Sequence, residues 1–212
     1  MAGTTTVLLV RHGRTPSNVA QALDSAPPGP GLDATGRAQA EAVAAELAAT
    51  PLDAVYASRA RRAQETAAAV AAPHGLPVDI LDGAHEVQVG DLEGSTDPAH
   101  WARLQGLLGE WMRGDRDDRM PGGESGREVT ARFRAEIERV AQASPGGRVV
   151  VVTHGGAMRL VTLDLCPEVD GHFAADHPVP NTGSIELRYD PDTGWSCARW
   201  AEQGQPVPAG QA

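Results

Sequence analysis

Two stretches of the sequence, VLLVRHG at residues 7–13 and VVVVTHGG at residues 149–156, share one pattern. Each is a short apolar run, rich in β-branched residues, that ends in a His-Gly pair. Such runs are typical of strands buried on both faces of a parallel sheet, where functional residues gather just beyond the carboxyl ends of the strands. The sequence therefore predicts an α/β fold in which His12 and His154 share one crevice.

Cationic and hydrogen-bonding side chains surround the first of these histidines. Arg11 precedes His12, and the segment RTPSN follows at residues 14–18. A lone histidine after a strand is more often a hydrogen-bonded structural group, but the adjacent arginine and the second His-Gly pair favour a functional site. This set of donors suits an anion, and we expect the crevice to bind phosphate.

The overall charge is acidic. The chain of 212 residues has a formal net charge of -10 at pH 7 and a pI near 5.1. An acidic protein lacks the positive field that attracts nucleic acids and membrane surfaces, so we expect neither as a partner. An anionic substrate must then be held by local charge, which Arg11 and the RARR cluster at residues 59–62 can supply.

The length fits one domain, and we predict a single domain over residues 1–202 followed by a flexible Pro/Gly-rich tail over residues 203–212. We find no targeting segment and no apolar run near the roughly 20 residues of a membrane span. Cys166 and Cys197 form no Cys-x-x-Cys motif and are expected to be free, buried thiols, with a disulfide between them as the alternative. These features predict a cytoplasmic protein.

Apolar periodicity and capping residues predict alternating helices and strands. Asp33 is expected to cap a long helix that ends before Pro51, and Ser58 to cap a second helix with Arg61 and Arg62 in its first turn. Cationic side chains there oppose the helix dipole, which indicates a bound anion. The other predicted elements are helices at 16–23 and 157–165, a helix that follows the segment PGGES at 121–125, a strand at 52–57, and a terminal hairpin of strands at 185–189 and 195–200. The apolar face of the helix after PGGES includes Val129, Phe133, Ile137 and Val140.

A further amphipathic helix is predicted from Trp101, Leu104, Leu108 and Trp111, which recur at helical spacing. Two interpretations of this stripe stand. It packs into the core, as such stripes usually do, or the segment 97–119 forms a lid over the site.

Five motifs occur in order along the chain: RHG at 11–13, SxxxRAxETA at 58–67, ExxxGxxEG at 86–94, GES at 123–125 and THGG at 153–156. The segment LDxxGRxQA at 32–40 lies between the first two. Together they resemble the histidine phosphatase superfamily, the phosphoglycerate-mutase-like group, from about residue 7 to residue 189. The resemblance implies a three-layer α/β/α sandwich with a mostly parallel central sheet, an antiparallel edge strand, and an active site at the carboxyl edge of the sheet.

The resemblance implies that His12 is the nucleophile and attacks phosphorus to form a phosphohistidine, which water then hydrolyses. An imidazole with a pKa near 6.5 has a free lone pair at pH 7, so it needs neither a separate base nor a metal to act as a nucleophile. Arg11 and Arg62 match the family's two phosphate arginines and are expected to clamp the phosphoryl oxygens, with His154 as a further donor, cationic if protonated.

Three further positions complete the implied site. Asn18 matches the family's amide donor, and the N–H of Gly155 at a helix start is an additional oxyanion contact. Glu86 falls at the position of the acid that protonates the leaving oxygen and then takes a proton from the attacking water. Glu93 is the alternative acid, although its spacing fits a loop-ordering role better.

Two ambiguities concern the arginines. Arg59 or Arg61 could be mistaken for Arg62, and both are expected to be solvated or to meet the remote part of the substrate. At residue 14, where this family usually has Glu or Gln, the chain has arginine. Arg14 either adds a cation to the pocket or points to solvent, and the second interpretation is favoured because exposed arginines are common.

We predict no metal and no cofactor, because the other histidines fit no zinc-site spacing: His74, His85, His100, His172 and His177. The predicted function is a metal-independent phosphatase acting on a small phosphorylated metabolite. A phosphoglycerate mutase and a non-catalytic phosphate-sensing or protein-binding module are the alternatives. A homodimer through an exposed edge strand is a further expectation.

Overall fold

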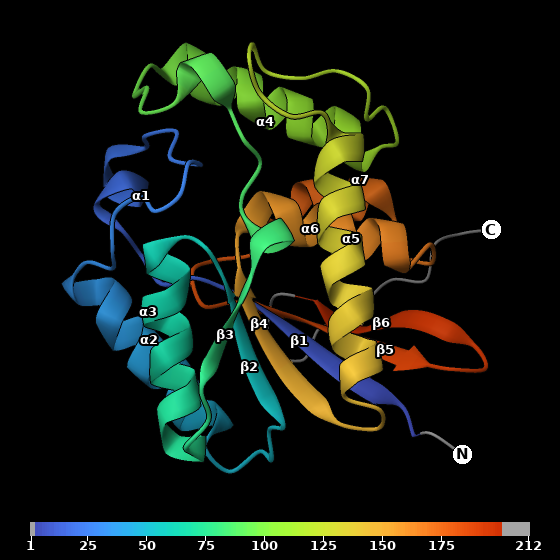
Figure 1. The fold of residues 1–212 in the computed structure, drawn as a ribbon. Helices are drawn as coiled ribbons and strands as arrows, with labels where there is room; N and C mark the ends of the chain where they lie inside the picture. Colours follow the sequence, from blue (N-terminus) through green and yellow to red (C-terminus); the bar gives the residue numbers. More distant parts are fainter. Residues whose placement is uncertain (1–2, 201–212) are drawn as a thin grey trace.

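Strand β1 (Thr5–Arg11) lies inside a six-stranded sheet in the computed structural model, which describes residues 3–200. It pairs in parallel with β4 (Arg148–Thr153) on one side and antiparallel with β5 (Ser184–Asp190) on the other. The strand order is β3-β2-β4-β1-β5-β6, completed by β2 (Ala54–Ser58), β3 (Val78–Leu81) and β6 (Gly194–Trp200). The sheet is visible at the centre of Figure 1.

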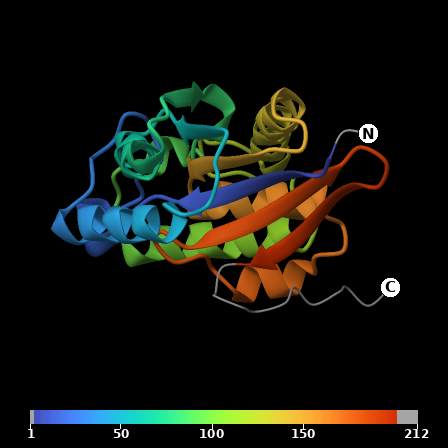
Figure 2. The same ribbon diagram turned by 90° about the horizontal axis from the view of Figure 1, so that it is seen from below.

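The antiparallel part of the sheet is the β5-β6 hairpin. Strands β3, β2, β4 and β1 run parallel to one another, and β5 lies antiparallel beside β1. Figure 2 shows the hairpin closing one end of the sheet. The predicted α/β fold with a mostly parallel sheet and an antiparallel edge is confirmed.

Helices cover both faces of the sheet and make it the middle of three layers. Leu8 and Val10 pack in a cluster with α2 (Ala34–Leu47) and α3 (Arg61–Ala71), whereas Val7 and Leu9 belong to the cluster on the opposite face. That second face is covered by α5 (Gly126–Ala143) and α6 (Gly155–Leu165). Burial on both sides stabilises each of these aliphatic side chains by about 1.5–3 kcal/mol, which explains why the run is continuously apolar.

The predicted start of α2 is confirmed and that of α3 is corrected. Asp33 is the N-cap of α2 and accepts a hydrogen bond from the N–H of Gly36. The N-cap of α3 is Ala60, whose side chain makes no capping bond, and Ser58 instead ends β2. Ser58 is two residues too early to cap α3, and its buried hydroxyl bonds His154 instead.

The long amphipathic helix, α4 (Pro98–Met112), lies across the carboxyl end of the sheet (Figure 1). Leu104, Leu108 and Trp111 are buried in the core, whereas Trp101 is 37% exposed. Leu104 and Leu108 also line a pocket together with Trp101 and His12. The stripe therefore packs into the core and at the same time forms one wall of the pocket.

The remaining helices are short: α1 (Pro16–Ala20), α7 (Gly171–Asp176) and the 3-10 turns η1 (Ala72–His74), η2 (Asp82–Ala84) and η3 (Gly90–Leu92). Helix α1 begins at the predicted proline and ends earlier than expected, and α6 begins two residues earlier than predicted. Within residues 3–200, no helix is both long and apolar enough to cross a membrane. The predicted tail at 203–212 lies outside the described residues.

Cys166 and Cys197 are both buried and both free, as predicted. Burial, reinforced by the charge of Glu168, raises the pKa of the Cys197 thiol to about 12. Burial raises the pKa of Cys166 as well. Both side chains therefore act as small apolar groups of the core.

Candidate active site

The two histidines meet because β1 and β4 are parallel neighbours. Arg11 and Thr153 are register partners at the ends of these strands, so His12 and His154 follow at the same edge of the sheet. Their ring centroids lie 5.1 Å apart. Strand β1 leads to a helix on one face and β4 to a helix on the other, which opens a crevice at this point of the sheet. The two histidines lie together at this edge of the sheet, as predicted, but only His12 is among the residues that line the pocket, and His154 is fully buried beside it.

Two glycines let the loop after His12 pass close to α2. A Cβ on Gly36 would overlap the carbonyl of Arg14, and a Cβ on Gly13 would press on the carbonyl of Gly36. The N–H of Gly13 donates to the hydroxyl of Thr66 across 3.0 Å. Contact with α2 and α3 thus fixes the backbone beside His12.

His12 is buried, with 4% of its surface exposed, and its hydrogen bonds define its tautomer. Nδ1 lies 2.8 Å from the carbonyl of Gly13, which can only accept, so Nδ1 carries the hydrogen. Nε2 accepts a hydrogen bond from Nε of Arg62 across 3.2 Å. Burial, followed by the charges of Arg62 and Arg11, holds the pKa of His12 well below 6.5. The ring is therefore neutral at pH 7, with its lone pair on Nε2.

His154 is fully buried and is neutral for the same reasons. Arg62 donates to its Nδ1 across 3.4 Å, which leaves the hydrogen on Nε2, 2.7 Å from the hydroxyl of Ser58. Burial and the charge of Arg62 hold the pKa of His154 well below 6.5. The ring nitrogen that faces the arginine accepts in this state, and it becomes a donor only when the ring takes up a proton.

Arg62 stands at the centre of the site, at the first turn of α3. Besides the two histidines, it contacts Asp24, with NH1 3.3 Å from the carboxylate and NH2 3.0 Å from the backbone carbonyl. Arg59 and Arg61 are exposed and pair with Asp82 and Glu65, and neither lines the pocket. Of the three arginines, only Arg62 reaches the site.

Arg11 reaches the crevice from the end of β1. Its NH1 donates to the carbonyl of Val179 across 2.8 Å, while its buried Nε has no hydrogen-bond partner among residues 3–200. Gly155 leaves room for this guanidinium, because a Cβ there would lie 3.3 Å from Nε. Burial lowers the pKa of Arg11, and Glu86 partly opposes the shift. A buried N–H without an acceptor is suited to bind an anion that enters the pocket.

Asn18 and Gly155 each present a donor to the pocket that they line. The Oδ1 of Asn18 accepts from the N–H of Thr15 and from the side chain of Asn181, so its NH₂ group is left for a ligand. Gly155 is the first residue of α6, and within residues 3–200 no acceptor is assigned to its N–H. Both lie where the sequence predicts phosphate donors.

Glu86 lies at the amino end of α6, where His154 as N-cap offers no side-chain bond. Its carboxylate replaces that cap: Oε1 accepts from the N–H groups of Ala157 and Val87, and Oε2 accepts from that of Gly156. The positive end of the helix dipole stabilises a carboxylate there. Glu86 also lines the pocket, as predicted for the acid.

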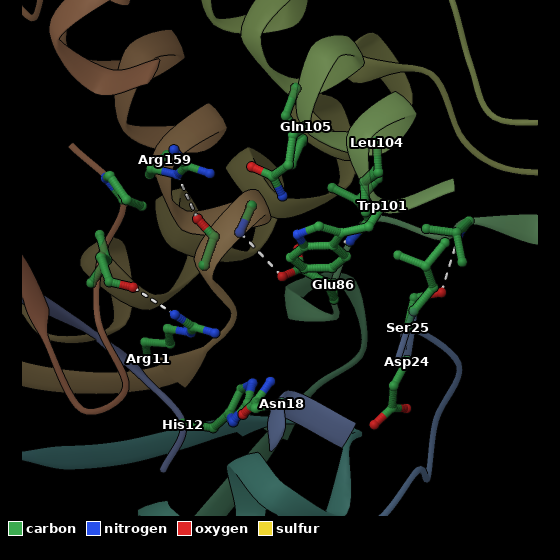
Figure 3. Close-up of a pocket in the computed structure, with 18 of the residues that line it drawn as sticks. Arg11, His12, Asn18, Asp24, Ser25, Glu86, Trp101, Leu104, Gln105 and Arg159 are labelled. Atoms are coloured by element: carbon green, nitrogen blue, oxygen red, sulfur yellow. Dashed lines mark hydrogen bonds between the residues drawn. The ribbon is translucent and has the colours of Figure 1, made fainter. Parts of the chain in front are cut away.

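The crevice is one end of a cavity of about 380 Å³, shown in Figure 3. His12 and Asn18 lie at one end, while Arg159 from α6 and Gln105 from α4 lie at the other. Trp101 and Leu104 supply an apolar wall. The cavity thus has a cationic end near His12. The end beneath α4 combines polar side chains with an apolar wall.

Two positions left ambiguous by the sequence are settled by their contacts. Arg14 points away from the pocket, pairs with Asp33 across 2.8 Å and donates to Thr35. Glu93 binds the backbone and hydroxyl of Ser25 and the N–H of Ala26, so it orders the loop at residues 24–31. Arg14 adds no cation to the pocket, and Glu93 does not compete with Glu86.

Sequence reasoning missed four residues of the site. Ser58 and Asp24 orient His154 and Arg62, and Arg159 lines the far end of the pocket. Asn181 donates to the carbonyl of His12 across 3.0 Å and to Asn18. Arg159 carries a weak signal, because an arginine on the face of an otherwise apolar helix must find a polar partner. Asn181 and Asp24 lie in loops, and only the tertiary fold brings these loops close to His12 and Arg62.

Over the described part of the chain, no group of three or more His, Cys, Asp or Glu side chains is arranged to hold a metal ion. The cationic groups that line the crevice are the side chains of Arg11, Arg62 and Arg159.

A three-layer α/β fold with two histidines and two arginines at one sheet edge is the arrangement of a phosphate-handling enzyme class. Residues 7–203 match the histidine phosphatase superfamily (branch 1), and the chain belongs to this family. The family predicted from the motifs is confirmed.

Curated relatives of this chain include a PE-PGRS family protein and a probable phosphoglycerate mutase. PE_PGRS11, a PE-PGRS family protein of Mycobacterium tuberculosis, is 32% identical over 93% of this chain, but the match spans only 36% of that relative's length. A probable phosphoglycerate mutase GpmB of an Enterobacter species is 30% identical over 72% of this chain and 70% of its own.

Solved structures agree with this assignment. A protein described as mycobacterial hydrolase 1 is 26% identical, with a TM-score of 0.82 over 94% of this chain and 99% of its own. A mycobacterial glucosyl-3-phosphoglycerate phosphatase is 25% identical, with a TM-score of 0.81 over 94% of this chain and all of its own (100%). Membership of the superfamily supports phosphatase or mutase activity.

Proposed function

We propose that this protein is a metal-independent phosphatase that hydrolyses the phosphomonoester of a small metabolite through a phosphohistidine on His12. The observation that carries the proposal is the neutral ring of His12, whose Nε2 lone pair faces the guanidinium of Arg62. A lone pair held among cationic donors can attack the phosphorus of an anion that those donors bind.

The first step forms the Nε2–P bond and breaks the bond between phosphorus and the alcohol oxygen. Arg11, with its unpartnered Nε, and Arg62 bind the phosphoryl oxygens, and Asn18 and the N–H of Gly155 add neutral donors. Arg62 then exchanges its bond to His12 for bonds to the phosphoryl group. His154 stabilises the same charge if it takes up a proton on binding.

Glu86, which the second step of each cycle leaves protonated, supplies the proton that the leaving alcohol oxygen needs. Its Oε2 accepts one N–H, whereas Oε1 accepts two, so Oε2 is the oxygen with room for that proton. In the second step Glu86 takes a proton from water, the water oxygen bonds to phosphorus, and the N–P bond breaks to release phosphate and restore neutral His12.

The test is phosphate release from a panel of phosphomonoesters in EDTA, with His12→Ala alongside. We expect release by the wild-type protein and its loss in His12→Ala. Release that needs added metal, or that survives in His12→Ala, would contradict the proposed mechanism. Arg14→Ala is a matched control, because Arg14 lies beside the same loop but outside the pocket.

A second candidate is a mutase, favoured by the similarity to a probable phosphoglycerate mutase. A mutase must keep its phosphohistidine from water and return the phosphoryl group to a second hydroxyl. A phosphohistidine that persists in water and transfers to phosphoglycerate would favour the mutase. Phosphate binding without covalent capture would favour a non-catalytic module.

The setting of this activity is also a proposal. We infer a cytoplasmic protein that acts on a small molecule, and the net charge of -10 supports partners other than nucleic acids and anionic membranes. A homodimer through the exposed edge strands is part of the same proposal.

A further inference from the structure

Glu86 lies in an irregular segment between η2 and η3, and one side chain from α5 holds the backbone of that segment. The carbonyls of Gly83 and His85 accept from NH1 of Arg132 across 2.6 Å and 2.8 Å. The carbonyl of Glu86 itself accepts from NH2 of Arg132 across 3.0 Å. A single guanidinium therefore binds three carbonyls within a stretch of four residues.

Arg132 is held in turn by Glu124, the acidic residue of the GES motif at 123–125. Its Nε donates to Oε1 of Glu124 across 2.8 Å, and NH2 donates to Oε2 across 2.9 Å. All five N–H groups of the guanidinium thus have acceptors, three on carbonyls and two on the carboxylate. Such a bidentate pair fixes the plane of the guanidinium as well as its position.

Glu124 also contacts the same segment directly. Its Oε2 accepts from the N–H of Gln88 across 3.0 Å, and its own N–H donates to the carbonyl of Gln88 across 3.0 Å. Burial acts to raise the pKa of Glu124, but the adjacent ring of His85 and the guanidinium of Arg132 lower it to about 2. Glu124 is therefore an anion at neutral pH, and its pair with Arg132 holds the segment on both sides of Glu86.

The turn before Glu86 is packed directly against α5. A Cβ on Gly83 would overlap the carbonyl of Arg132, and the N–H of Gly83 donates to Oε1 of Glu136 across 3.0 Å. The side chains of Arg132 and Glu124 are only 16% and 20% exposed. A partly buried, bidentate pair holds its geometry more firmly than an exposed pair, which contributes little.

These contacts matter most when Glu86 is protonated. The carboxylate of Glu86 is bonded to the amino end of α6, whereas its backbone is bonded to Arg132 on α5. The helix dipole of α6 attracts a carboxylate, and this attraction is lost when the carboxyl takes up a proton. The backbone bonds to Arg132 do not depend on that proton, so they still define the position of the neutral acid.

We propose that Arg132, held by Glu124, is a positioning residue that keeps the protonated carboxyl of Glu86 aligned with the leaving alcohol oxygen. This inference rests on the proposed function, in which Glu86 is the proton donor, and it gives the GES motif a role in that chemistry. Neither Arg132 nor Glu124 is among the residues that line the pocket with His12, so both act through Glu86 and not on the substrate.

The test compares two esters that differ in whether their leaving group needs a proton. Glycerol 3-phosphate releases an alkoxide that must be protonated, whereas p-nitrophenyl phosphate releases a stable anion. Arg132→Met should lower kcat/KM for glycerol 3-phosphate about 10- to 100-fold, the effect of misplacing a catalytic group by about 1 Å. It should lower kcat/KM for p-nitrophenyl phosphate less than about threefold, because His12 and the phosphate donors keep their places.

Two further variants guard against a folding defect in Arg132→Met. Arg132→Lys keeps the charge but not the planar set of donors, so it should recover only part of the loss on glycerol 3-phosphate. Glu124→Gln weakens the pair and should show the same selective loss, about 3- to 10-fold. Arg134→Met is the matched control, because Arg134 lies on the same helix and pairs with Asp164 and Glu138 instead. It should leave the ratio of the two activities unchanged.

A double variant shows whether Arg132 acts through Glu86. In Glu86→Gln no proton donor remains to be positioned, so the addition of Arg132→Met should lower the remaining activity on glycerol 3-phosphate less than about threefold. Losses that multiply, or equal losses on both esters in Arg132→Met, would overturn the positioning role while leaving the phosphatase intact. Absence of release from every phosphomonoester, with correctly folded wild-type protein, would overturn the proposed function itself.

Discussion

The hydroxyl of Ser58 and the Nε2 of His154 are joined by a 2.7 Å hydrogen bond between two side chains that are completely buried. The bond fixes the tautomer of His154, because its other nitrogen accepts from Arg62. It also explains why a serine at the end of β2 does not cap the following helix. Ser58 is thus a positioning residue, which holds a ring nitrogen toward the phosphate end of the crevice.

Ser58→Ala should therefore weaken both stability and activity. The change leaves the Nε2–H of His154 buried without an acceptor, at a cost of about 1–3 kcal/mol of unfolding free energy. The freed ring should lower kcat by about tenfold with little change in KM. Urea unfolding and initial rates measure the two effects. Ser58→Thr, which keeps a hydroxyl, should recover part of kcat, and equal activities of both variants and wild type would rule out positioning.

Glu86→Gln tests whether Glu86 is the proton donor, by comparing substrates whose leaving groups do and do not need a proton. The amide cannot supply a proton, so kcat for an alkyl phosphate should fall by about 10²- to 10⁴-fold. An ester of p-nitrophenol leaves without protonation and should lose much less. The loss of charge at the amino end of α6 should cost about 1 kcal/mol of stability. Equal losses on both esters would assign Glu86 a purely structural role.

Acid should destabilise the fold through its two buried histidines. The pKa values of His12 and His154 lie well below 6.5 in the folded protein, whereas the unfolded chain titrates near 6.5. Below pH 6.5 the unfolded state binds protons that the folded state does not, so unfolding free energy falls by about 1.4 kcal/mol per pH unit for each histidine. The contribution of the two neutral histidines to the unfolding free energy is fully present above pH 6.5. It is lost as the pH falls from 6.5 to their folded-state pKa values.

Urea unfolding between pH 7.5 and 5.5 measures this dependence. His154→Asn should show a slope shallower by about one proton, because one buried titrating group has been removed. His172→Asn is the control, since His172 is an exposed histidine on α7 outside the site, and it should keep the wild-type slope. An unchanged slope in His154→Asn would mean that the ring is not held neutral.

The glycine contact between the His12 loop and α2 gives a prediction about backbone geometry. A Cβ at Gly36 overlaps the carbonyl of Arg14, so Gly36→Ala must displace that loop and should cost more than about 2 kcal/mol together with most of the activity. Gly106→Ala on α4 is the matched change, because no atom lies within 4 Å of its added Cβ. Gly106→Ala should stabilise the protein by about 0.5–1 kcal/mol, and thermal unfolding distinguishes the two.

The sequence predicted those features that depend on local pattern. The continuous apolar run before His12 could be recognised as a strand buried on both faces, and Asp33 as a helix cap, because each signal lies within a few residues. The motif spacing selected Arg62 over its two neighbours, which are exposed in the structure. These choices required no knowledge of the tertiary packing.

The features that the sequence did not predict depend on contacts between distant segments. The local sequence predicts Ser58 as a helix cap. Its hydroxyl instead bonds His154, which lies 96 residues away in the chain and therefore leaves no local signal. Asp24 and Asn181 contact Arg62 and His12 from loops with no regular pattern. Arg159 lies within the helix predicted at 157–165, and only the packing of α6 beside α4 reveals that its guanidinium lines a pocket.

The network around Arg62 bears on what happens after each turnover. Without phosphate, every nitrogen of this guanidinium already has an acceptor in Asp24, His12 or His154. Inorganic phosphate must therefore replace these internal hydrogen bonds in order to bind Arg62. Because the internal bonds form again when phosphate leaves, their free energy is subtracted from the net binding free energy of phosphate. The internal acceptors and the product phosphate thus compete for the same guanidinium. This competition favours rapid release of phosphate and weak product inhibition.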